Sequence, residues 1–178
     1  METAVVMLRG VNVSGRNRLP MDDLRRLVAD LGCRDVETYI QSGNVVCRVA
    51  RPVDELGPAL AAGLESELGL TVPVIVRTGN DLAGVVRSNP LLAEGADPGF
   101  LHVTFLSAEP GADRVGGLDG RATGDDTFRL VGREVFLSCP GGYGNTKLTN
   151  ALCERVLGVQ ATTRNWRTVE RLASMADR

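Results

Sequence analysis

The sequence predicts an α+β fold, and three observations support this. Short apolar runs rich in β-branched residues alternate with segments of helical periodicity, and over residues 1–78 they follow the order β-α-β-β-α-β, the ferredoxin-like split motif. The same order returns over residues 100–178, after a linking helix and loop at 79–99. A chain of 178 residues is long enough for two such units to bury a core. We therefore expect two ferredoxin-like subdomains packed together, with a helix at the C-terminal end.

Residues 1–78 supply the first expected subdomain. In "PMDDLRRLVADLG", Leu24, Leu27 and Val28 recur at helical spacing. Ser42-Gly43 supplies a hairpin turn between two strands, and Gly57-Pro58 is expected to kink the second helix or to delay its start. The expected strands are 3–9, 36–40, 44–49 and 71–77, and the expected helices are 20–32 and 52–69.

The second expected subdomain has a weaker pattern. The segment "GADRVGGL" predicts no more than a weak helical turn, and "GLDGRATGDD" is typical of an exposed loop. The last helix carries Trp166, Val169, Leu172 and Met175 close to an i, i+3 stripe, which should pack on the body of the protein. The expected strands are 100–107, 126–132, 133–139 and 159–163, and the expected helices are 145–158 and 165–177.

Composition excludes several classes of function. Because 20 basic and 22 acidic residues give a net charge of −2, no global attraction draws the chain to nucleic acid or to a membrane. No apolar run is long enough to span a bilayer and no signal peptide is evident, so we expect a cytoplasmic protein without membrane contact. The single histidine, His102, cannot build a multi-histidine metal centre, and we expect neither a metal nor a cofactor. The cysteines, which predict small buried hydrophobes, are Cys33, Cys47, Cys139 and Cys153.

Three polar segments, 9–18, 39–44 and 162–167, interrupt the predicted scaffold where strands end or helices begin. Arginine side chains suit carboxylate or phosphate, whereas asparagine, glutamine and serine can either orient a ligand or close a tight turn. Thr163 or Asn165 could cap the last helix, and Trp166 is expected to anchor it. The candidate ligand-binding residues are Arg9, Asn12, Arg16, Asn17, Gln41, Ser42, Asn44, Arg164 and Asn165.

A fourth segment, "CPGGYGNTKLT" at 139–149, runs from a strand through glycines into a helix. This layout lets exposed backbone N–H groups and the helix dipole receive an anion. The segment lacks the Gly-Lys-Ser/Thr ending of a Walker A loop, and a glycine-rich connection is the favoured interpretation.

Several of these segments together resemble one family. "LRGVNVSGRNRLPM", "VETYIQSGNVV", "HVTFL" and "ATTRNWRTVERL" are similar, in this order, to the signature of the domain-of-unknown-function 1697 family. The resemblance extends over nearly the whole chain and implies a compact protein of two ferredoxin-like subdomains, with no assigned activity. Ser14, Cys47 and Leu91 depart from the residues usual in the family at these positions.

The favoured hypothesis is that the three polar segments converge on one basic pocket for a small phosphate- or carboxylate-bearing metabolite. Any reaction there would have to rely on positioning and electrostatic stabilisation, because no activated nucleophile is evident, and whether the protein is an enzyme stays open. A nucleic-acid-binding module that uses the same basic loops is a less favoured alternative. A structural or protein-interaction role without any ligand is the third. The oligomeric state does not follow from the sequence.

Overall fold

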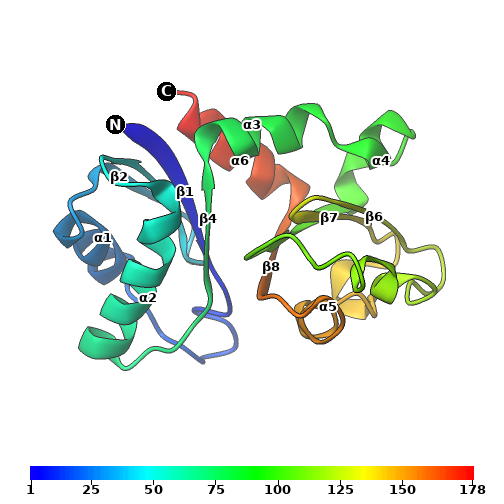
Figure 1. The fold of residues 1–178 in the computed structure, drawn as a ribbon, viewed down its shortest axis with the longest axis horizontal. Helices are drawn as coiled ribbons and strands as arrows, with labels where there is room; N and C mark the ends of the chain where they lie inside the picture. Colours follow the sequence, from blue (N-terminus) through cyan, green and yellow to red (C-terminus); the bar gives the residue numbers. More distant parts are fainter. The chain divides into compact units, whose positions relative to one another are not determined.

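A computed structural model describes residues 1–178. The chain forms two compact units, each with one four-stranded antiparallel sheet (Figure 1). The first unit comprises Met1–Gly84 and Arg171–Arg178, and the second comprises Val85–Glu170. The protein is therefore a mixed α+β structure, as the sequence predicts.

The first unit has the strand order β2-β3-β1-β4. Its pairing register joins Val5 of β1 to Val46 of β3 on one side and to Arg77 of β4 on the other. Because β1 and β3 are antiparallel neighbours, the end of β1 lies beside the start of β3. The elements are β1 (Glu2–Leu8), α1 (Met21–Asp30), β2 (Arg34–Tyr39), β3 (Asn44–Val49), α2 (Val53–Leu68) and β4 (Val74–Thr78).

Helices α1 and α2 cover the same face of the first sheet (Figure 1). Alternate residues of β1 point to that face, where they join the leucines of both helices in one buried cluster. The expected apolar stripe of α1 is buried at Leu24, Leu27 and Val28. Helix α2 begins at Val53, so the expected delay of its start at Gly57-Pro58 is wrong. Asp54 and Glu55 favour the earlier start because acidic side chains stabilise the first turn of a helix.

Two helices follow β4 along the chain, α3 (Gly79–Arg87) and α4 (Pro90–Ala93). The side chain of Asn89 accepts a hydrogen bond from the backbone N–H of Leu91, and Pro90 occupies the first position of α4. Asn89-Pro90 therefore ends one helix and begins a second short one, whereas the sequence pattern predicts a single linking helix.

The second unit has the strand order β6-β7-β5-β8. Between β5 and β6 the chain forms only a short 3₁₀ helix, Val115–Leu118, because the Gly116-Gly117 pair disfavours a longer helix. The strands are β5 (Leu101–Leu106), β6 (Thr127–Val131), β7 (Glu134–Ser138) and β8 (Ala161–Asn165). The remaining helices are α5 (Asn150–Leu157), α6 (Trp166–Ala176) and the 3₁₀ turns Pro98–Phe100 and Tyr143–Asn145.

Helix α5 packs its leucines on the second sheet in a separate buried cluster. The predicted stripe of α6 is confirmed, because Trp166, Val169, Leu172 and Met175 are all buried. All four cysteines are buried and free, and burial raises the pKa of Cys153 to about 11. None of the helices has the length and apolarity to cross a membrane.

His102 lies in β5, where two neighbouring residues contact its ring. Its Nδ1 atom lies 3.2 Å from the carbonyl oxygen of Phe100, and its ring stacks on Tyr143 with 4.9 Å between ring centroids. Burial lowers the pKa of His102 below the ordinary value of 6.5, against the opposing effect of the Phe100 hydrogen bond. The neutral form of the side chain therefore predominates at pH 7.

We expect an NMR titration of this single histidine to give a pKa below 6.5 in the folded protein. The unfolded chain then binds more protons than the folded chain at pH values between the lowered pKa and 6.5. The contribution of His102 to the free energy of unfolding should accordingly decrease as the pH falls through that window. The variant His102→Gln should remove this contribution, and a folded-state pKa at or above 6.5 would contradict the assignment.

Candidate functional site

Two of the three polar segments meet at one end of the first sheet. Residues 9–18 follow β1, and residues 40–43 connect β2 to β3; we call them the loop pair. The backbone N–H of Leu8 donates to the carbonyl of Gly43 at 2.9 Å, which joins the two segments where β1 ends. The antiparallel pairing of Met7 with Asn44 fixes this neighbourhood.

Gly43 lets the two parts of the loop pair approach closely. A Cβ atom at this position would lie 2.7 Å from both Leu8 Cβ and Val11 Cγ2, closer than carbon atoms can approach without displacement. Its backbone also has φ +74°, a conformation that favours glycine. Leu8 and Val11 are buried, so the turn 40–43 rests directly on the core of the first unit.

Asn12 holds the loop pair closed with its amide group. Nδ2 donates to the carbonyl oxygens of Leu19 at 2.9 Å and of Gln41 at 2.8 Å. Oδ1 accepts from the backbone N–H of Leu19 at 2.8 Å. The side chain of Asn12 thus binds Leu19, directly after residues 9–18, and Gln41 of the turn, 29 residues further along the chain.

The other asparagines of the segments also bond within them. Asn17 Nδ2 donates to the carbonyl of Gly10 at 3.0 Å. The amide of Asn44, which is buried, donates to Ser42 Oγ at 2.9 Å and to the carbonyl of Tyr39 at 3.3 Å. These contacts make Asn12, Asn17 and Asn44 elements of the loop scaffold.

Backbone strain concentrates in the loop pair. Five residues other than glycine have positive φ angles in the whole chain, and four of them lie here: Asn12 (55°), Ser14 (49°), Asn17 (47°) and Ile40 (50°). Asparagine tolerates this conformation, whereas a β-branched residue such as Ile40 adopts it only when its surroundings impose it. Strain of this kind costs of the order of 1–3 kcal/mol per residue and often marks functional sites.

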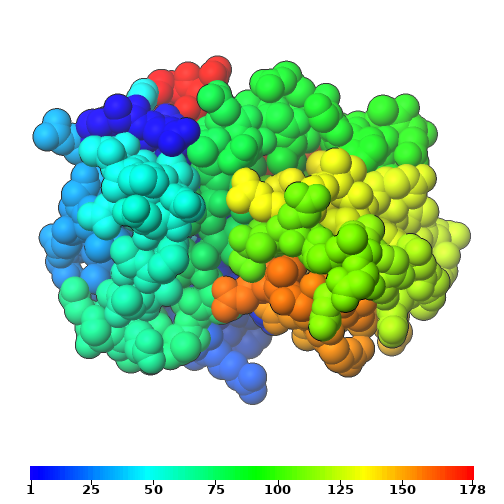
Figure 2. Space-filling view, viewed as in Figure 1, coloured from blue at the N-terminus to red at the C-terminus, as the bar shows by residue number.

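The side chains that face solvent on the loop pair include basic, apolar and neutral polar groups, but no acidic group. Arg16, Arg18 and Gln41 are exposed, and so are Val13 at 56% and Ile40 at 53%. Neither Arg16 nor Arg18 forms an ion pair within the chain. Figure 2 shows the segment around residue 15, in blue, standing out at the lower edge of the view.

The third segment belongs to the second unit, where it forms β8 and the start of α6. Arg164 is buried, with Nη1 donating to Thr162 Oγ1 at 2.8 Å and to the carbonyl of Thr163 at 2.9 Å. Burial lowers its pKa to about 10, so it is still charged at pH 7. Asn165 Oδ1 accepts from the N–H of Thr168 and caps α6, as expected. The convergence of this segment with the loop pair stays a prediction.

Sequence reasoning did not single out Val11 or Ile40. Val11 is an isolated apolar residue inside a polar loop, and this was the available signal that the loop packs inward. The left-handed backbone of Ile40 has no signal in sequence, because isoleucine is among the residues least suited to it.

We expect Gly43→Ala to lower the free energy of unfolding by about 2–4 kcal/mol, since the new methyl group adds both crowding and backbone strain. Gly15→Ala is the matched control: Gly15 has nearly the same φ, +73°, but has no atom within 4 Å of a Cβ. Its cost should be about 1 kcal/mol, from backbone strain alone. Urea unfolding of both variants measures the difference, and equal losses would contradict the close packing of the turn.

Asn12→Asp keeps the shape and the left-handed tolerance of the side chain but removes both donated hydrogen bonds. We expect a loss of about 1–3 kcal/mol, because two carbonyl oxygens lose their donor and face a carboxylate. Asn17→Asp, which removes one exposed bond to Gly10, should cost less. Urea unfolding again provides the measurement. If Asn17→Asp lowered the free energy of unfolding as much as Asn12→Asp, the assignment of Asn12 as the residue that holds the loop pair closed would be wrong.

The fold is similar to that of a conserved bacterial protein, SP0830, from Streptococcus pneumoniae, with a TM-score of 0.80, 20% sequence identity and 98% coverage of each chain. No curated protein matches the sequence. The family described as Protein of unknown function (DUF1697) matches residues 1–136, which include the loop pair and end before β8. The chain therefore belongs to this family, as its sequence signature indicates.

Proposed function

We propose that the protein binds a small anionic ligand, carrying phosphate or carboxylate groups, at the loop pair. The observation that carries this proposal is the combination of exposed, unpaired arginines with a strained and tightly held backbone. Residues 9–18 and 40–43 contain no acidic residue, so nothing within these segments neutralises Arg16 and Arg18. An anion would relieve the repulsion among these charges.

Rigidity of the loop pair favours ligand binding. Ordering a flexible loop on binding costs free energy, and a loop that is already fixed by Asn12 and Gly43 avoids that cost. We assign charge to Arg9, Arg16 and Arg18, and orientation of the ligand to Gln41 and Ser42. Asn12, Asn17 and Asn44 hold these groups in place.

We also infer that both units are variants of the ferredoxin-like arrangement. In the first unit, the element order β-α-β-β-α-β and the strand order β2-β3-β1-β4 support this inference. In the second unit, the equivalent strand order supports it, and the 3₁₀ helix Val115–Leu118 takes the place of the first helix.

A thermal-shift screen of phosphate- and carboxylate-bearing metabolites tests the proposed function. A ligand at a hundred times its dissociation constant should stabilise the protein by about 2.7 kcal/mol. The double variant Arg16→Gln/Arg18→Gln should weaken binding at least about tenfold, since hydrogen bonds between charged groups contribute more than neutral ones.

Arg34→Gln/Arg171→Gln is the matched control, because both side chains are exposed, lie outside the loop pair and carry the same total charge. It should leave the affinity within about twofold, the effect of screened distant charges. Equal weakening by the two double variants would reject a site at the loop pair. Binding of mixed oligonucleotides that falls steeply with salt concentration would instead assign the loop pair to nucleic acid.

A further inference from the structure

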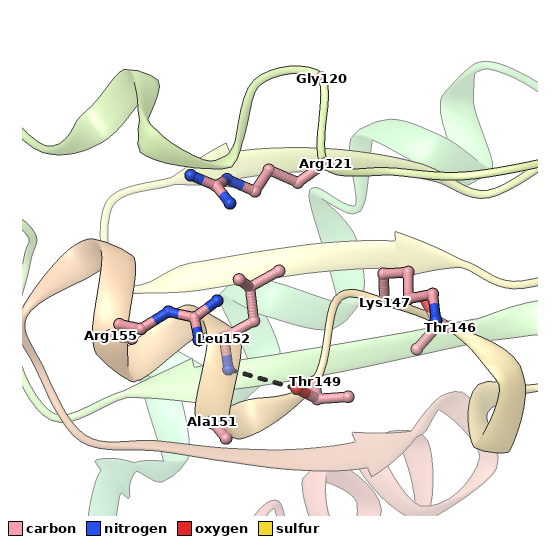
Figure 3. Close-up of a pocket in the computed structure, with 8 residues that line it drawn as sticks. All are labelled: Gly120, Arg121, Thr146, Lys147, Thr149, Ala151, Leu152 and Arg155. Carbon is pink, nitrogen blue, oxygen red and sulfur yellow. Dashed lines mark hydrogen bonds between the residues drawn. The ribbon is translucent and has the colours of Figure 1, made fainter.

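A cavity of about 550 Å³ opens in the second unit, and none of the residues that line it belongs to the loop pair. Figure 3 shows the eight residues that line it, with Arg121 on the loop at one side and Arg155 on α5 across from it. The volume lies within the range of small-molecule sites. The lining residues are Gly120, Arg121, Thr146, Lys147, Thr149, Ala151, Leu152 and Arg155.

The charge of this cavity is entirely positive. Arg121, Lys147 and Arg155 come from three different segments, and none of the eight lining residues is acidic. The guanidinium of Arg121 is tethered by its Nε, which donates to the carbonyl of Gly117 at 3.1 Å and leaves both terminal nitrogens available. Lys147 and Arg155 form no ion pair within the chain.

The acidic residue nearest to this cavity along α5 is engaged elsewhere. Glu154 precedes Arg155, but its Oε1 accepts a hydrogen bond from the backbone N–H of Ala161 at 3.0 Å. It therefore stabilises the start of β8, and it is not among the residues that line the cavity. Without an anion, the three cations around the hollow repel one another across an apolar wall formed by Ala151 and Leu152.

The start of α5 adds to the positive potential. Thr149 Oγ1 accepts from the backbone N–H of Leu152 at 3.2 Å and caps the helix, whose first turn carries no acidic residue. Thr149, Ala151 and Leu152 all line the cavity, so its wall includes the positive end of the helix dipole.

We propose that this cavity is a second ligand site, which takes a small polyanion bearing phosphate groups. Three separate cations can each contact a different oxygen of a pyrophosphate-like group, whereas a single carboxylate would leave at least one cation unpaired. Leu152 and Ala151 offer contact to an uncharged part of the same ligand. The site uses none of the residues assigned to the loop pair, and so the two sites stand or fall separately.

Isothermal titration calorimetry of the full chain with inorganic pyrophosphate tests this site, with citrate as a polycarboxylate of comparable charge. We expect pyrophosphate to bind more tightly than citrate, and Arg121→Gln/Arg155→Gln to weaken pyrophosphate binding at least about tenfold. Circular dichroism and thermal unfolding of the variant verify the fold, which should survive because both side chains are exposed. Lys147→Gln should weaken binding in the same direction.

Arg87→Gln/Arg171→Gln is the matched control, because it removes the same charge from exposed positions outside the cavity. It should not change the dissociation constant more than about twofold. The Arg16→Gln/Arg18→Gln background removes any pyrophosphate binding by the loop pair, and in this background Arg121→Gln/Arg155→Gln should still weaken binding at least about tenfold. The inference is overturned by an absence of pyrophosphate binding at millimolar concentration, by tighter binding of citrate, or by equal weakening in the matched control. A loss of binding confined to Arg16→Gln/Arg18→Gln would place pyrophosphate at the loop pair and overturn only the inference on the cavity.

Discussion

The arrangement of the first unit's candidate site depends on one close contact, that of the Gly43 backbone with Leu8 and Val11. Leu8 is the last residue of β1, and Val11 lies three residues into the loop that follows, so the turn 40–43 covers the place where the chain leaves the sheet. The hydrogen bond from Leu8 N–H to the Gly43 carbonyl and the bond from Asn12 to the Gln41 carbonyl are formed only at this separation. A hydrophobic contact at the base therefore fixes a polar surface above it, and the strained residues of the loop pair persist because the packing below determines their positions.

Most of the first unit follows from local patterns. The stripe of α1, the alternation of β1 and the hairpin between β2 and β3 are each encoded within about ten residues, which is the range over which periodicity and turn residues act. Pro58 shows the limit of such rules: proline disfavours a helix interior, but the buried side chains of α2 on both sides of it outweigh one missing hydrogen bond. The second unit was less predictable for two reasons. Its glycine-rich segments have no hydrophobic periodicity, and the burial of residues 161–165, "ATTRN", depends on partners that are distant in the sequence. Thr163, for example, bonds Thr104 and Asn150.

The candidate site was predictable in location but not in the role of each residue. The polar segments stand out because they interrupt apolar runs, and the sequence order alone places two of them at adjoining strand ends. Whether an asparagine contacts a ligand or a carbonyl oxygen depends on which backbone group lies opposite. For Asn12, which lies between β1 and α1, one such group belongs to Gln41 in the turn between β2 and β3. The polar neighbours of Arg164 in the sequence suggest a cation in an exposed loop. In the structure, Arg164 pairs with Val103 of β5, and its side chain is buried.

Some arginines form ion pairs within the chain, whereas Arg16, Arg18 and Arg155 form none. Acidic side chains of the two helices in the first unit are engaged with other arginines. Asp22 and Asp30 of α1 pair with Arg25 and Arg26 of the same helix, and Glu67 of α2 also bonds Arg26. Exposed ion pairs of this kind each contribute less than about 1 kcal/mol to the free energy of unfolding. Their stabilising effect therefore does not determine the positions of the remaining arginines. Arg34, Arg87 and Arg171 are exposed cations that form no ion pair and lie outside both candidate sites. Arg16 with Arg18 occupies one loop, and Arg121 with Lys147 and Arg155 lines one hollow. A local excess of one sign of charge is costly in the free protein, and an anion bound at either proposed site would offset that cost.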